Sequence, residues 1–406
     1  MMERVVITGL GIICGNANSK DEFAAALAQG TLGIKKCKTF NTEGLSTPYF
    51  GEAITAHMLR EVYDPETATQ NRFYDMLGLS LREMMKDAGV GAEDFAAMGN
   101  RCRMFFGTFL YYSETYALYW KGKHYGQEDH SLVLSNDYTA FARKITGIKG
   151  TAAVSTSACA SSAAAVGMAM DYIRNGLCDV AAVVGIDALS LGEAYGFQAL
   201  KLLSGGICNP YDKNRDGINI GEGCAVLLLE SLSHAKARKA QIYGEVAGYA
   251  LGNDAYHIIS PEPTGESAYR VMKNALADAG ITADQVDYIN GHGTGTLSND
   301  TMEMQAIEKL MADTDKQVWL SSTKSLVGHC MGAAGAVELI SVLLSMDSGH
   351  YIPMPNLKDP IDHDEKIFMS GKAVPLDIKY ALSNSFAFAG NSAAVVLKKY
   401  EGGGEG

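Results

Sequence analysis

The chain repeats one pattern of secondary structure, and this repeat constrains its fold more than any other feature. Ten short apolar segments alternate with stretches of helical periodicity, five on each side of a basic helical stretch at residues 233–240. Strands that alternate with helices in this way predict an α/β fold. The predicted strands are residues 5–9, 103–107, 151–157, 180–185 and 224–230 in the first half, and 243–250, 286–291, 318–323, 380–385 and 393–398 in the second.

The repeat also predicts how the chain is divided. With 406 residues, the chain exceeds the usual size of a single hydrophobic core. In each half a segment of small residues precedes a helix, at 158–170 and at 328–345. We therefore expect two similarly wound halves, 1–240 and 241–400, followed by a flexible glycine-rich tail at 401–406.

Composition argues against several classes of partner and location. A formal net charge of −12 disfavours nucleic acid and anionic membranes as partners, because both are negatively charged. The sequence has no signal-peptide pattern, and we expect no run of about eighteen large apolar residues that could span a bilayer, so a cytoplasmic protein is predicted. The eight cysteines form no C-x-x-C pair, which argues against a disulfide framework and a zinc site.

Cys159 lies at the junction of a predicted strand and a predicted helix. The strand ends at Ser157, and the helix that follows begins with small residues that leave room for a substrate. The N–H groups and the positive dipole of a helix N-terminus favour a thiolate, and we expect no nearby carboxylate to oppose this effect. Cys159 is therefore a candidate nucleophile, and an inert core cysteine is the alternative.

Two histidines follow predicted strands of the second half. His292 lies among three glycines in the segment 290–296, where bare backbone allows a substrate to approach closely. His329 precedes a helix whose N-terminus should lower the pKa of the imidazole and favour its neutral form. Lys324 and Glu338 flank His329 and have opposite charges, so they could pair. Taken singly, His292 could also be a structural loop histidine that is bonded to the backbone, and Lys324 could be an exposed lysine at a strand end.

Two further segments contain notable turns. Residues 383–392 place Phe386 and Phe388 on a tight turn after the last-but-one strand, where they could also simply line the core. Together with the thiol, the two imidazoles and the lysine, this turn indicates one catalytic site at strand ends.

The glycine-rich segment 9–15 has glycine spacing one residue too long for a dinucleotide-binding fingerprint, so we interpret it as a plain loop.

These four segments, in this order, resemble those of the β-ketoacyl synthase family, the condensing enzymes of fatty acid and polyketide assembly within the thiolase superfamily. The resemblance spans nearly the whole chain and includes the segments 209–212, 215–217 and 221–223. It implies a thiolase-like α/β fold, with duplicated five-stranded mixed sheets in an α/β/α/β/α sandwich of five layers. It also implies a dimer formed through the strand before the active cysteine, either a homodimer or a ketosynthase/chain-length-factor heterodimer.

The resemblance further implies an acyltransferase and a role for each candidate residue. Cys159 would accept an acyl group from acyl carrier protein, and His292 and His329 would promote decarboxylation of malonyl-acyl carrier protein, giving a 3-oxoacyl product. The backbone N–H groups of Cys159 and Phe388 would hold an oxyanion. No metal or other cofactor is implied. The remaining implied roles are organisation of the pocket by Lys324 and Glu338, gating by Phe388, and contacts to the substrate or its phosphopantetheine arm by Thr294, Thr296, Phe386 and Leu110.

Several positions depart from the family pattern. Ala387 and Ala389 replace glycines beside Phe388, which we expect to stiffen the gate. Leu297 and Asn299 replace the proline and glycine that usually follow the His-Gly-Thr motif. Bulky aromatic residues in the segments 109–112 and 116–120 predict a specialised substrate, for example an unsaturated or polyketide chain.

The expected docking charges for an acidic carrier protein are also reduced. Only Arg72 remains of the basic residues that relatives often carry in the segment 64–72. Possible replacements are Lys201, Lys213 and Arg215, although each also fits a solvated surface charge.

Two other functions stay open at this point. A non-catalytic partner subunit characteristically lacks the nucleophile, whereas this chain keeps Cys159 and both histidines. A thiolase would need a second active thiol near the C-terminus, and no cysteine follows Cys330. Both alternatives are therefore weaker than an active condensing enzyme.

Overall fold

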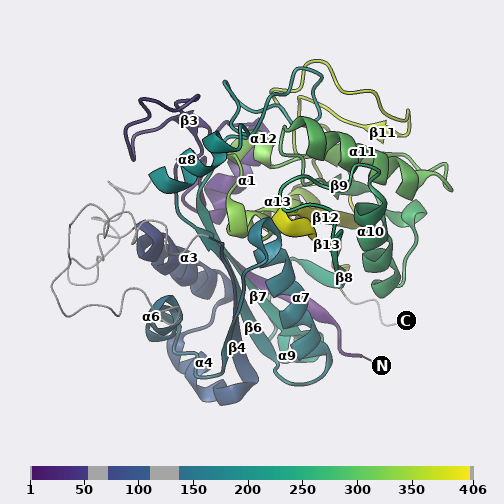
Figure 1. The fold of residues 1–406 in the computed structure, drawn as a ribbon. Coiled ribbons are helices and arrows are strands. Elements are labelled where there is room, and N and C mark those ends of the chain that lie inside the picture. The colour runs from purple at the N-terminus through teal and green to yellow at the C-terminus, as the bar shows by residue number, and fades with distance from the viewer. Residues whose placement is uncertain (1, 54–71, 110–136, 403–406) are drawn as a thin grey trace.

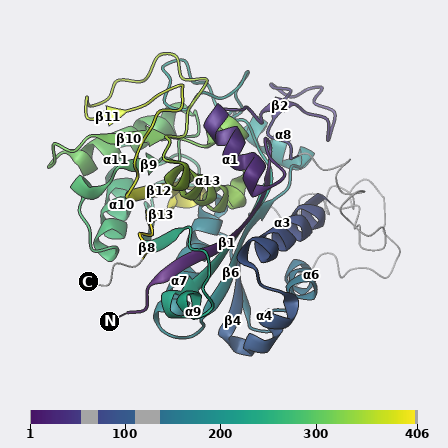
Figure 2. The same cartoon turned by 180° about the vertical axis from the view of Figure 1, so that it is seen from behind.

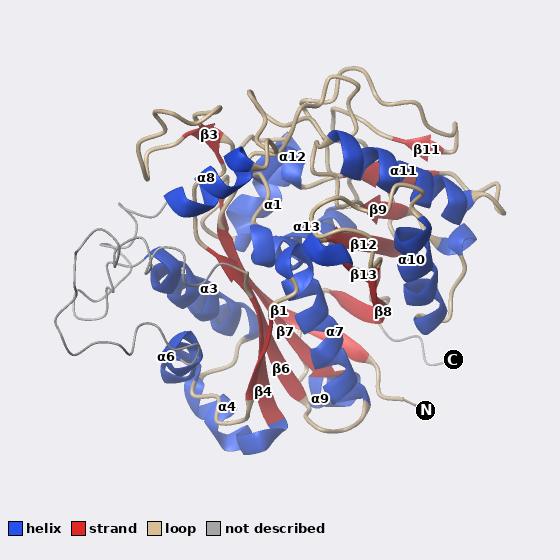
Figure 3. Ribbon diagram, viewed as in Figure 1, coloured by secondary structure: helices blue, strands red, loops and turns tan. Residues whose placement is uncertain are grey.

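The computed structural model describes residues 2–53, 72–109 and 137–402, and two groups of five strands form the frame of this part of the chain (Figures 1 and 3). The first group is β1 (Val5–Cys14), β4 (Cys102–Gly107), β5 (Ala152–Ser155), β6 (Val180–Asp187) and β7 (Gly223–Ser231). The second is β8 (Gly244–Asn253), β9 (Tyr288–Asn290), β10 (Val318–Ser321), β12 (Tyr380–Phe386) and β13 (Asn391–Lys398). All ten predicted strands are present.

The two groups share one topology. Across the sheet they run β5-β4-β6-β7-β1 and β10-β9-β12-β13-β8, which is the third, second, fourth, fifth and first strand of each group. In both groups the first three strands of this order are parallel, and the other neighbours are antiparallel. The predicted duplication into mixed five-stranded halves is therefore confirmed.

The two halves are joined through their first strands. β1 and β8 pair only over Val5–Ile7 and Gly244–Val246. With the short strand β11 (Ile367–Phe368) beside β10, this pairing makes one 11-stranded sheet from the two predicted ones. A separate two-stranded sheet pairs β2 (Lys35–Lys36) with β3 (Tyr49–Phe50). The boundary between domains at residue 240 stays a prediction.

Helices complete the predicted sandwich of five layers (Figures 1 and 2). The central layer contains α7 (Ser161–Arg174) and α13 (Ala334–Ser348), which pack against each other and against strands of both halves. The outer layers are α3 (Arg72–Ala88), α4 (Ala92–Met98) and α6 (Asp137–Thr146) on the first half, and α10 (Glu266–Asp278) and α11 (Leu297–Met311) on the second. The other described α-helices are α1 (Lys20–Gln29), α8 (Leu191–Ala199), α9 (Leu232–Ala237) and α12 (Lys324–Val327).

The helix α13 of the central layer is strongly apolar. The segment Met331–Ser348, which contains α13, has the length and mean hydropathy of a membrane span, but it includes Glu338 and Asp347 and is not a run of large apolar residues. In addition, 89% of this segment is buried inside the protein. Burial of a large apolar side chain contributes about 1.5–3 kcal/mol, so this helix stabilises the sandwich as a core element.

The glycine-rich segment 9–15 is not the loop that we predicted, because β1 continues through it to Cys14. Its glycines are required by close packing of α3 on the strand. A Cβ atom on Gly11 would lie 2.0 Å from the carbonyl oxygen of Ser80, and one on Gly9 would lie 2.7 Å from the Cβ of Ala88. The glycines therefore permit helix packing, and a sequence pattern alone does not distinguish this use from a turn.

Candidate active site

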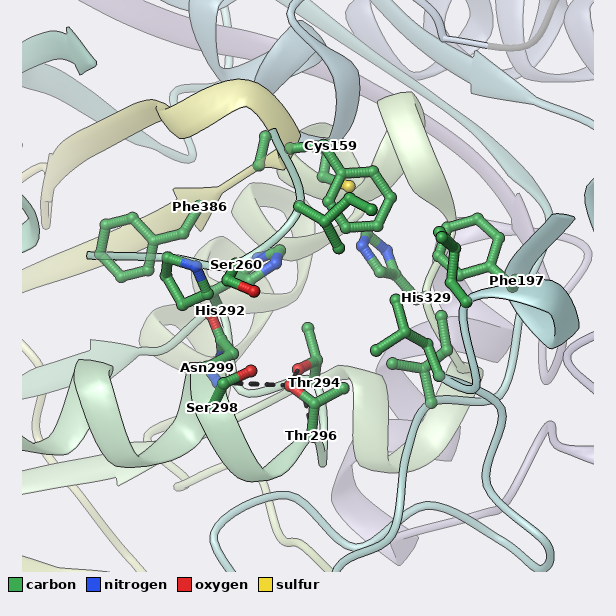
Figure 4. A pocket seen from close by; sticks show the side chains of 17 residues that line it. Cys159, Phe197, Ser260, His292, Thr294, Thr296, Ser298, Asn299, His329 and Phe386 are labelled. Atoms are coloured by element: carbon green, nitrogen blue, oxygen red, sulfur yellow. Dashed lines mark hydrogen bonds between the residues drawn. The ribbon is translucent and has the colours of Figure 1, made fainter. Parts of the chain in front are cut away.

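Cys159 lies in a tight corner between β5 and α7, as predicted. A 3-10 turn, Ala158–Ala160, precedes the helix, and Ala158 has the positive φ of 49° that is uncommon for a residue with a side chain. Such strain is typical of backbone that fixes a functional side chain in place. The Cys159 side chain is buried but reaches the wall of a cavity of about 220 Å³ (Figure 4).

The resting state of the thiol differs from the sequence prediction. Burial raises the pKa of Cys159 to about 12, and the charge of Lys324 only partly opposes this effect. The carboxylates of Asp187, Glu338 and Glu193 raise the pKa further, so the expectation that no carboxylate would be near is wrong. These groups come from distant parts of the chain, and their approach follows from the fold alone. At neutral pH the Cys159 side chain is therefore a protonated thiol.

The same cavity collects residues from both halves of the chain. Besides Cys159, the predicted residues that line it are His292, Thr294, Thr296, His329, Phe386 and Phe388. In Figure 4 the two histidines lie between the cysteine and the threonines. Leu110 and the aromatic residues of the segments 110–112 and 116–120 lie outside the described residues. The structure thus brings together every predicted lining residue that it describes.

His292 is held by a loop that follows β9. Gly293 and Gly295 have φ values of 35° and 81°, which favour glycine. Two buried carboxylates on α11 bind the backbone of this loop. Glu303 accepts hydrogen bonds from the N–H groups of His292 at 2.7 Å and Gly293 at 2.8 Å, and Asp300 accepts from those of Thr294 and Gly295 at 3.0 and 3.2 Å. The loop is therefore rigidly positioned.

Lys324 determines which nitrogen of His292 faces the cavity. Its ammonium group lies 3.2 Å from Nδ1 of His292 and forms a buried ion pair with Glu338. Because an ammonium group can only donate, Nδ1 accepts the bond and the ring proton resides on Nε2. Burial lowers the pKa of His292 well below its ordinary value, and Lys324 and His329 lower it further. His292 is therefore a neutral Nε2–H donor.

His329 has the same tautomer for a different reason. Its Nδ1 accepts a hydrogen bond from the backbone N–H of Met331 at 3.2 Å, so its proton also resides on Nε2. Burial lowers its pKa well below the ordinary value, and Lys324 adds to this effect. The predicted direction is correct, but burial and not a helix N-terminus is the main cause. The rings of His292 and His329 lie 5.3 Å apart, so two neutral donors share one cavity.

Phe388 lies at the edge of the cavity on the turn after β12. Its ring stacks on that of Phe197 from α8, with 5.7 Å between the ring centroids. Ala389 has a φ of 57° and so carries its Cβ in the left-handed region, as the departure from glycine suggested. Ala387 is extended with a φ of −133°, so the expectation that both alanines replace strained glycines holds only for Ala389.

Sequence reasoning missed Asp300 and Glu303. Both are fully buried, three residues apart on the helix that directly follows the glycine-rich loop. That spacing places them on one face of α11, toward the loop. The available signal was a pair of acidic residues in the first turns of a helix after a strand-end loop, a pattern that also fits an ordinary solvated helix start.

Two of the proposed docking charges are used inside the protein. Arg72 forms an ion pair with the buried Glu222. Arg215 is 7% exposed and donates to the carbonyl oxygens of Thr296 at 3.2 Å and Leu297 at 3.1 Å. Arg215 therefore supports the loop at the cavity wall, and the alternative that it is a solvated surface charge is wrong. Of the other two, Lys213 forms ion pairs with Asp359 and Asp362, and Lys201 is exposed.

Within the described residues, no group of three or more histidine, cysteine or acidic side chains could hold a metal ion. The polar side-chain groups that line the cavity are a thiol, two neutral imidazoles, hydroxyls and the amide of Asn299. A thiol beside paired N–H donors can transfer an acyl group and stabilise an enolate.

Comparisons with known proteins define the class. The sequence model of the β-ketoacyl synthase N-terminal domain matches residues 2–235, and that of the C-terminal domain matches residues 243–358. The chain is 33% identical to 3-oxoacyl-[acyl-carrier-protein] synthase 2 of Staphylococcus aureus (strain N315), covering 98% of this chain and 99% of that protein. Nodulation protein E of Rhizobium sp. (strain N33) is 32% identical, with coverage of 98% and 100%.

Solved structures agree with these relatives. The ishigamide ketosynthase/chain length factor superposes with a TM-score of 0.87 and 30% identity, covering 99% of this chain and 100% of that one. A β-ketoacyl synthase from Burkholderia phymatum STM815 gives 0.86 and 26%, with coverage of 98% and 100%. The fold is thus the thiolase-like fold of condensing acyltransferases. The chain belongs to the β-ketoacyl synthase family.

Proposed function

We propose that this protein condenses an acyl group carried on Cys159 with malonyl-acyl carrier protein and releases a 3-oxoacyl-acyl carrier protein and CO₂. One observation supports this assignment most strongly. The thiol of Cys159 and the two neutral imidazoles of His292 and His329 line one cavity, although they are far apart in the sequence. The assignment agrees with the family and with the names of the relatives.

The first step transfers an acyl group. The Cys159 sulfur attacks the carbonyl carbon of the acyl thioester, a C–S bond forms, and the carrier leaves as its thiol with the proton that Cys159 releases. The tetrahedral oxyanion is held by the backbone N–H groups of Cys159 and Phe388, each in the first turn of a 3-10 segment, where such groups have no intrahelical partner. The buried charge of Lys324 favours the thiolate during this step.

The second step forms the carbon–carbon bond. Malonyl thioester loses CO₂, and the electron pair of the broken bond becomes an enolate whose oxygen accepts hydrogen bonds from Nε2–H of His292 and His329. The enolate carbon attacks the acyl-Cys159 carbonyl, and the tetrahedral intermediate collapses with release of the Cys159 thiolate. The product is a 3-oxoacyl chain two carbons longer. Neutral donors suit this step because they stabilise the enolate without protonating its carbon.

We assign supporting roles to the other residues of the site. Lys324 and Glu338 hold His292 in its tautomer, and Thr294 and Thr296 contact the phosphopantetheine arm that carries each substrate. Phe388 gates the cavity, and Phe386 packs beside His292, with 6.1 Å between the ring centroids. The chemistry described requires no metal or redox cofactor, because imidazole and backbone N–H groups stabilise each developing charge.

We propose a dimer formed through β5. Among the described residues this strand is the edge of the sheet, and its Val154 is 38% exposed. An unpaired edge strand is a template for pairing with a second chain. A heterodimer deserves a test beside the homodimer, because one structural relative is described as a ketosynthase/chain length factor. Another is described as a type II PKS acyl-carrier protein in complex with its ketosynthase, which supports an acyl carrier protein as partner. Eight free cysteines favour a reducing, cytoplasmic location.

Acylation of the intact protein tests the assignment. The protein is incubated with an acyl-acyl carrier protein of defined chain length, and the adduct is located by peptide mass spectrometry. We expect one acyl group on Cys159 and none on the Cys159→Ala variant. Absence of any adduct would favour a non-catalytic partner subunit, and an adduct on another cysteine would contradict the assignment of the nucleophile. A series of saturated and unsaturated chains then tests the prediction of a specialised substrate.

A further inference from the structure

Asn299 stands in the wall of the cavity at a position where the family usually has glycine. It is the third residue of α11 and is only 8% exposed, yet it lines the cavity together with Thr294 and Thr296 (Figure 4). A buried amide side chain needs hydrogen-bond partners for both its oxygen and its nitrogen. Both polar atoms of the Asn299 side chain therefore need a partner at the cavity wall.

The orientation of this amide is fixed by its neighbour. Nδ2 of Asn299 donates to Oδ1 of the buried Asp300 at 3.1 Å. Because a carboxylate accepts hydrogen bonds, the nitrogen must face Asp300 and the oxygen must face the other way. The backbone N–H of Asn299 donates to Oγ1 of Thr296 at 3.3 Å, which holds the residue in place. No other described residue donates to Oδ1 of Asn299, so this oxygen is an acceptor that remains free at the cavity wall.

Thr296 supplies a donor on the same wall. Oγ1 of Thr294 and Oγ1 of Thr296 lie 2.9 Å apart, so one hydroxyl donates to the other. The alternative acceptor for Thr294, Oδ1 of Asp300, is more distant at 3.5 Å and already accepts three N–H groups. The shorter contact favours donation from Thr294 to Thr296, and this direction leaves the hydroxyl proton of Thr296 free to point into the cavity.

A free donor and a free acceptor on one wall match one chemical group, a secondary amide, whose C=O accepts and whose N–H donates. The phosphopantetheine arm contains such an amide next to its cysteamine unit. We propose that Asn299 is a positioning residue that accepts the N–H of this amide through Oδ1, while Thr296 donates to its C=O. This inference rests on the proposed function. The cavity of about 220 Å³ also contains Cys159, so the amide nearest to the thioester is the one that this wall meets.

The positioning role differs from that of a structural asparagine. Asn299 holds the arm at two points together with Thr296, so the thioester carbon is presented to Cys159 in one orientation. Loss of the Oδ1 acceptor leaves the amide N–H of a bound substrate without a partner, which costs affinity for amide substrates alone. The affinity for a substrate without that N–H should not change when the Oδ1 acceptor is removed.

Two small acyl donors that differ by one group test the inference. One is an acyl thioester of N-acetylcysteamine, which carries the amide, and the other is its 2-acetoxyethyl analogue, in which an ester oxygen replaces the N–H. The rate of Cys159 acylation at limiting substrate is followed by intact-protein mass spectrometry. We expect the wild-type protein to prefer the amide about three- to tenfold, and Asn299→Ala to lose this preference, as for one hydrogen bond.

Two further variants separate positioning from general damage. Thr296→Val removes the donor to a carbonyl that both substrates keep, so it should slow both to a similar extent. Gln305→Ala changes an exposed residue of the same helix and should keep the wild-type preference. Because the preference is a ratio within one protein, a lower folded fraction of Asn299→Ala does not alter it. The inference is overturned if Asn299→Ala keeps the amide preference or the wild-type protein has none. Failure of both substrates to acylate wild-type Cys159 would contradict the proposed function as well.

Discussion

Lys324 lies 3.2 Å from Nδ1 of His292 and is paired at the same time with the carboxylate of Glu338. All three side chains are almost completely buried. The ammonium group of Lys324 therefore both positions the imidazole of His292 and neutralises the buried carboxylate of Glu338. Burial raises the pKa of Glu338 to about 7 even with this partner, which shows how unfavourable an isolated carboxylate would be here.

Replacement of Lys324 tests this coupling through stability. Lys324→Met leaves Glu338 without a partner, and removal of one member of a buried ion pair costs about 3–5 kcal/mol of unfolding free energy. The double variant Lys324→Met, Glu338→Gln contains no unpaired charge and should recover much of that loss. Denaturant unfolding of the three proteins measures the effect. Equal stability of the single and double variants would show that the pair is not coupled.

The histidines predict an unusual pH dependence. Burial lowers the pKa of His292 and His329 well below 6.5, so both are neutral donors through the whole range near neutrality. Release of CO₂ from malonyl thioester should therefore show no acid inflection near pH 6.5. A lowered histidine pKa stabilises the folded protein above the unfolded pKa, and this contribution is lost as pH falls toward the folded pKa. Activity that halves near pH 6.5 would contradict the neutral state assigned to both histidines.

The thiol of Cys159 should react slowly in the free enzyme. Its pKa of about 12 means that thiolate is scarce at neutral pH. The rate of alkylation by iodoacetamide should rise about tenfold per pH unit between pH 7 and 9 without a plateau, since the thiolate is the reactive species. Peptide mapping separates Cys159 from the more exposed Cys37, which serves as the internal reference. A plateau for Cys159 below pH 9 would show that the thiol is activated before substrate binds.

Glu303 predicts an effect on the loop of His292. It accepts two backbone N–H groups there and also the hydroxyl of Tyr211 at 2.8 Å. Glu303→Gln turns one acceptor into an N–H₂ group that faces these donors, so His292 should lose its position. We expect CO₂ release to fall about 100-fold, at the lower end for loss of an acid–base group. Glu266→Gln, at an exposed ion pair with Lys309, is the control and should leave the rate unchanged.

The turn beside Phe388 offers a matched pair of substitutions. Ala389→Gly removes a Cβ from a residue at φ 57°, whereas Ala387→Gly changes an extended residue. We expect the first to free the gate and to speed acyl transfer to Cys159 several-fold, and the second to have little effect on it. Rapid-quench acylation measures both. Identical rates in wild type and Ala389→Gly would contradict the proposal that Ala389 stiffens the gate at Phe388.

The strands were predictable from the sequence because each combines apolar residues with glycine or polar boundaries, a local signal. The segment around Gly9 and Gly11 was wrongly predicted as a loop. Its glycines make room for α3, which is distant in the sequence but packs against this strand. For the same reason the sequence indicated Cys159 but not the carboxylates around it. The sequence shows that Arg72 and Arg215 are charged. Their ion pairs with Glu222 and Asp300 inside the protein could not be predicted, because they depend on tertiary packing.

The most direct test separates the two half-reactions. Acyl-enzyme formation is measured by intact mass, and CO₂ release from malonyl-acyl carrier protein by trapping of labelled gas. Cys159→Ala should release CO₂ but form no acyl-enzyme, whereas His292→Ala and His329→Ala should become acylated yet release CO₂ at least about 100-fold more slowly. Histidine variants that release CO₂ at the wild-type rate, or a Cys159→Ala protein that still becomes acylated, would contradict the assigned division of labour.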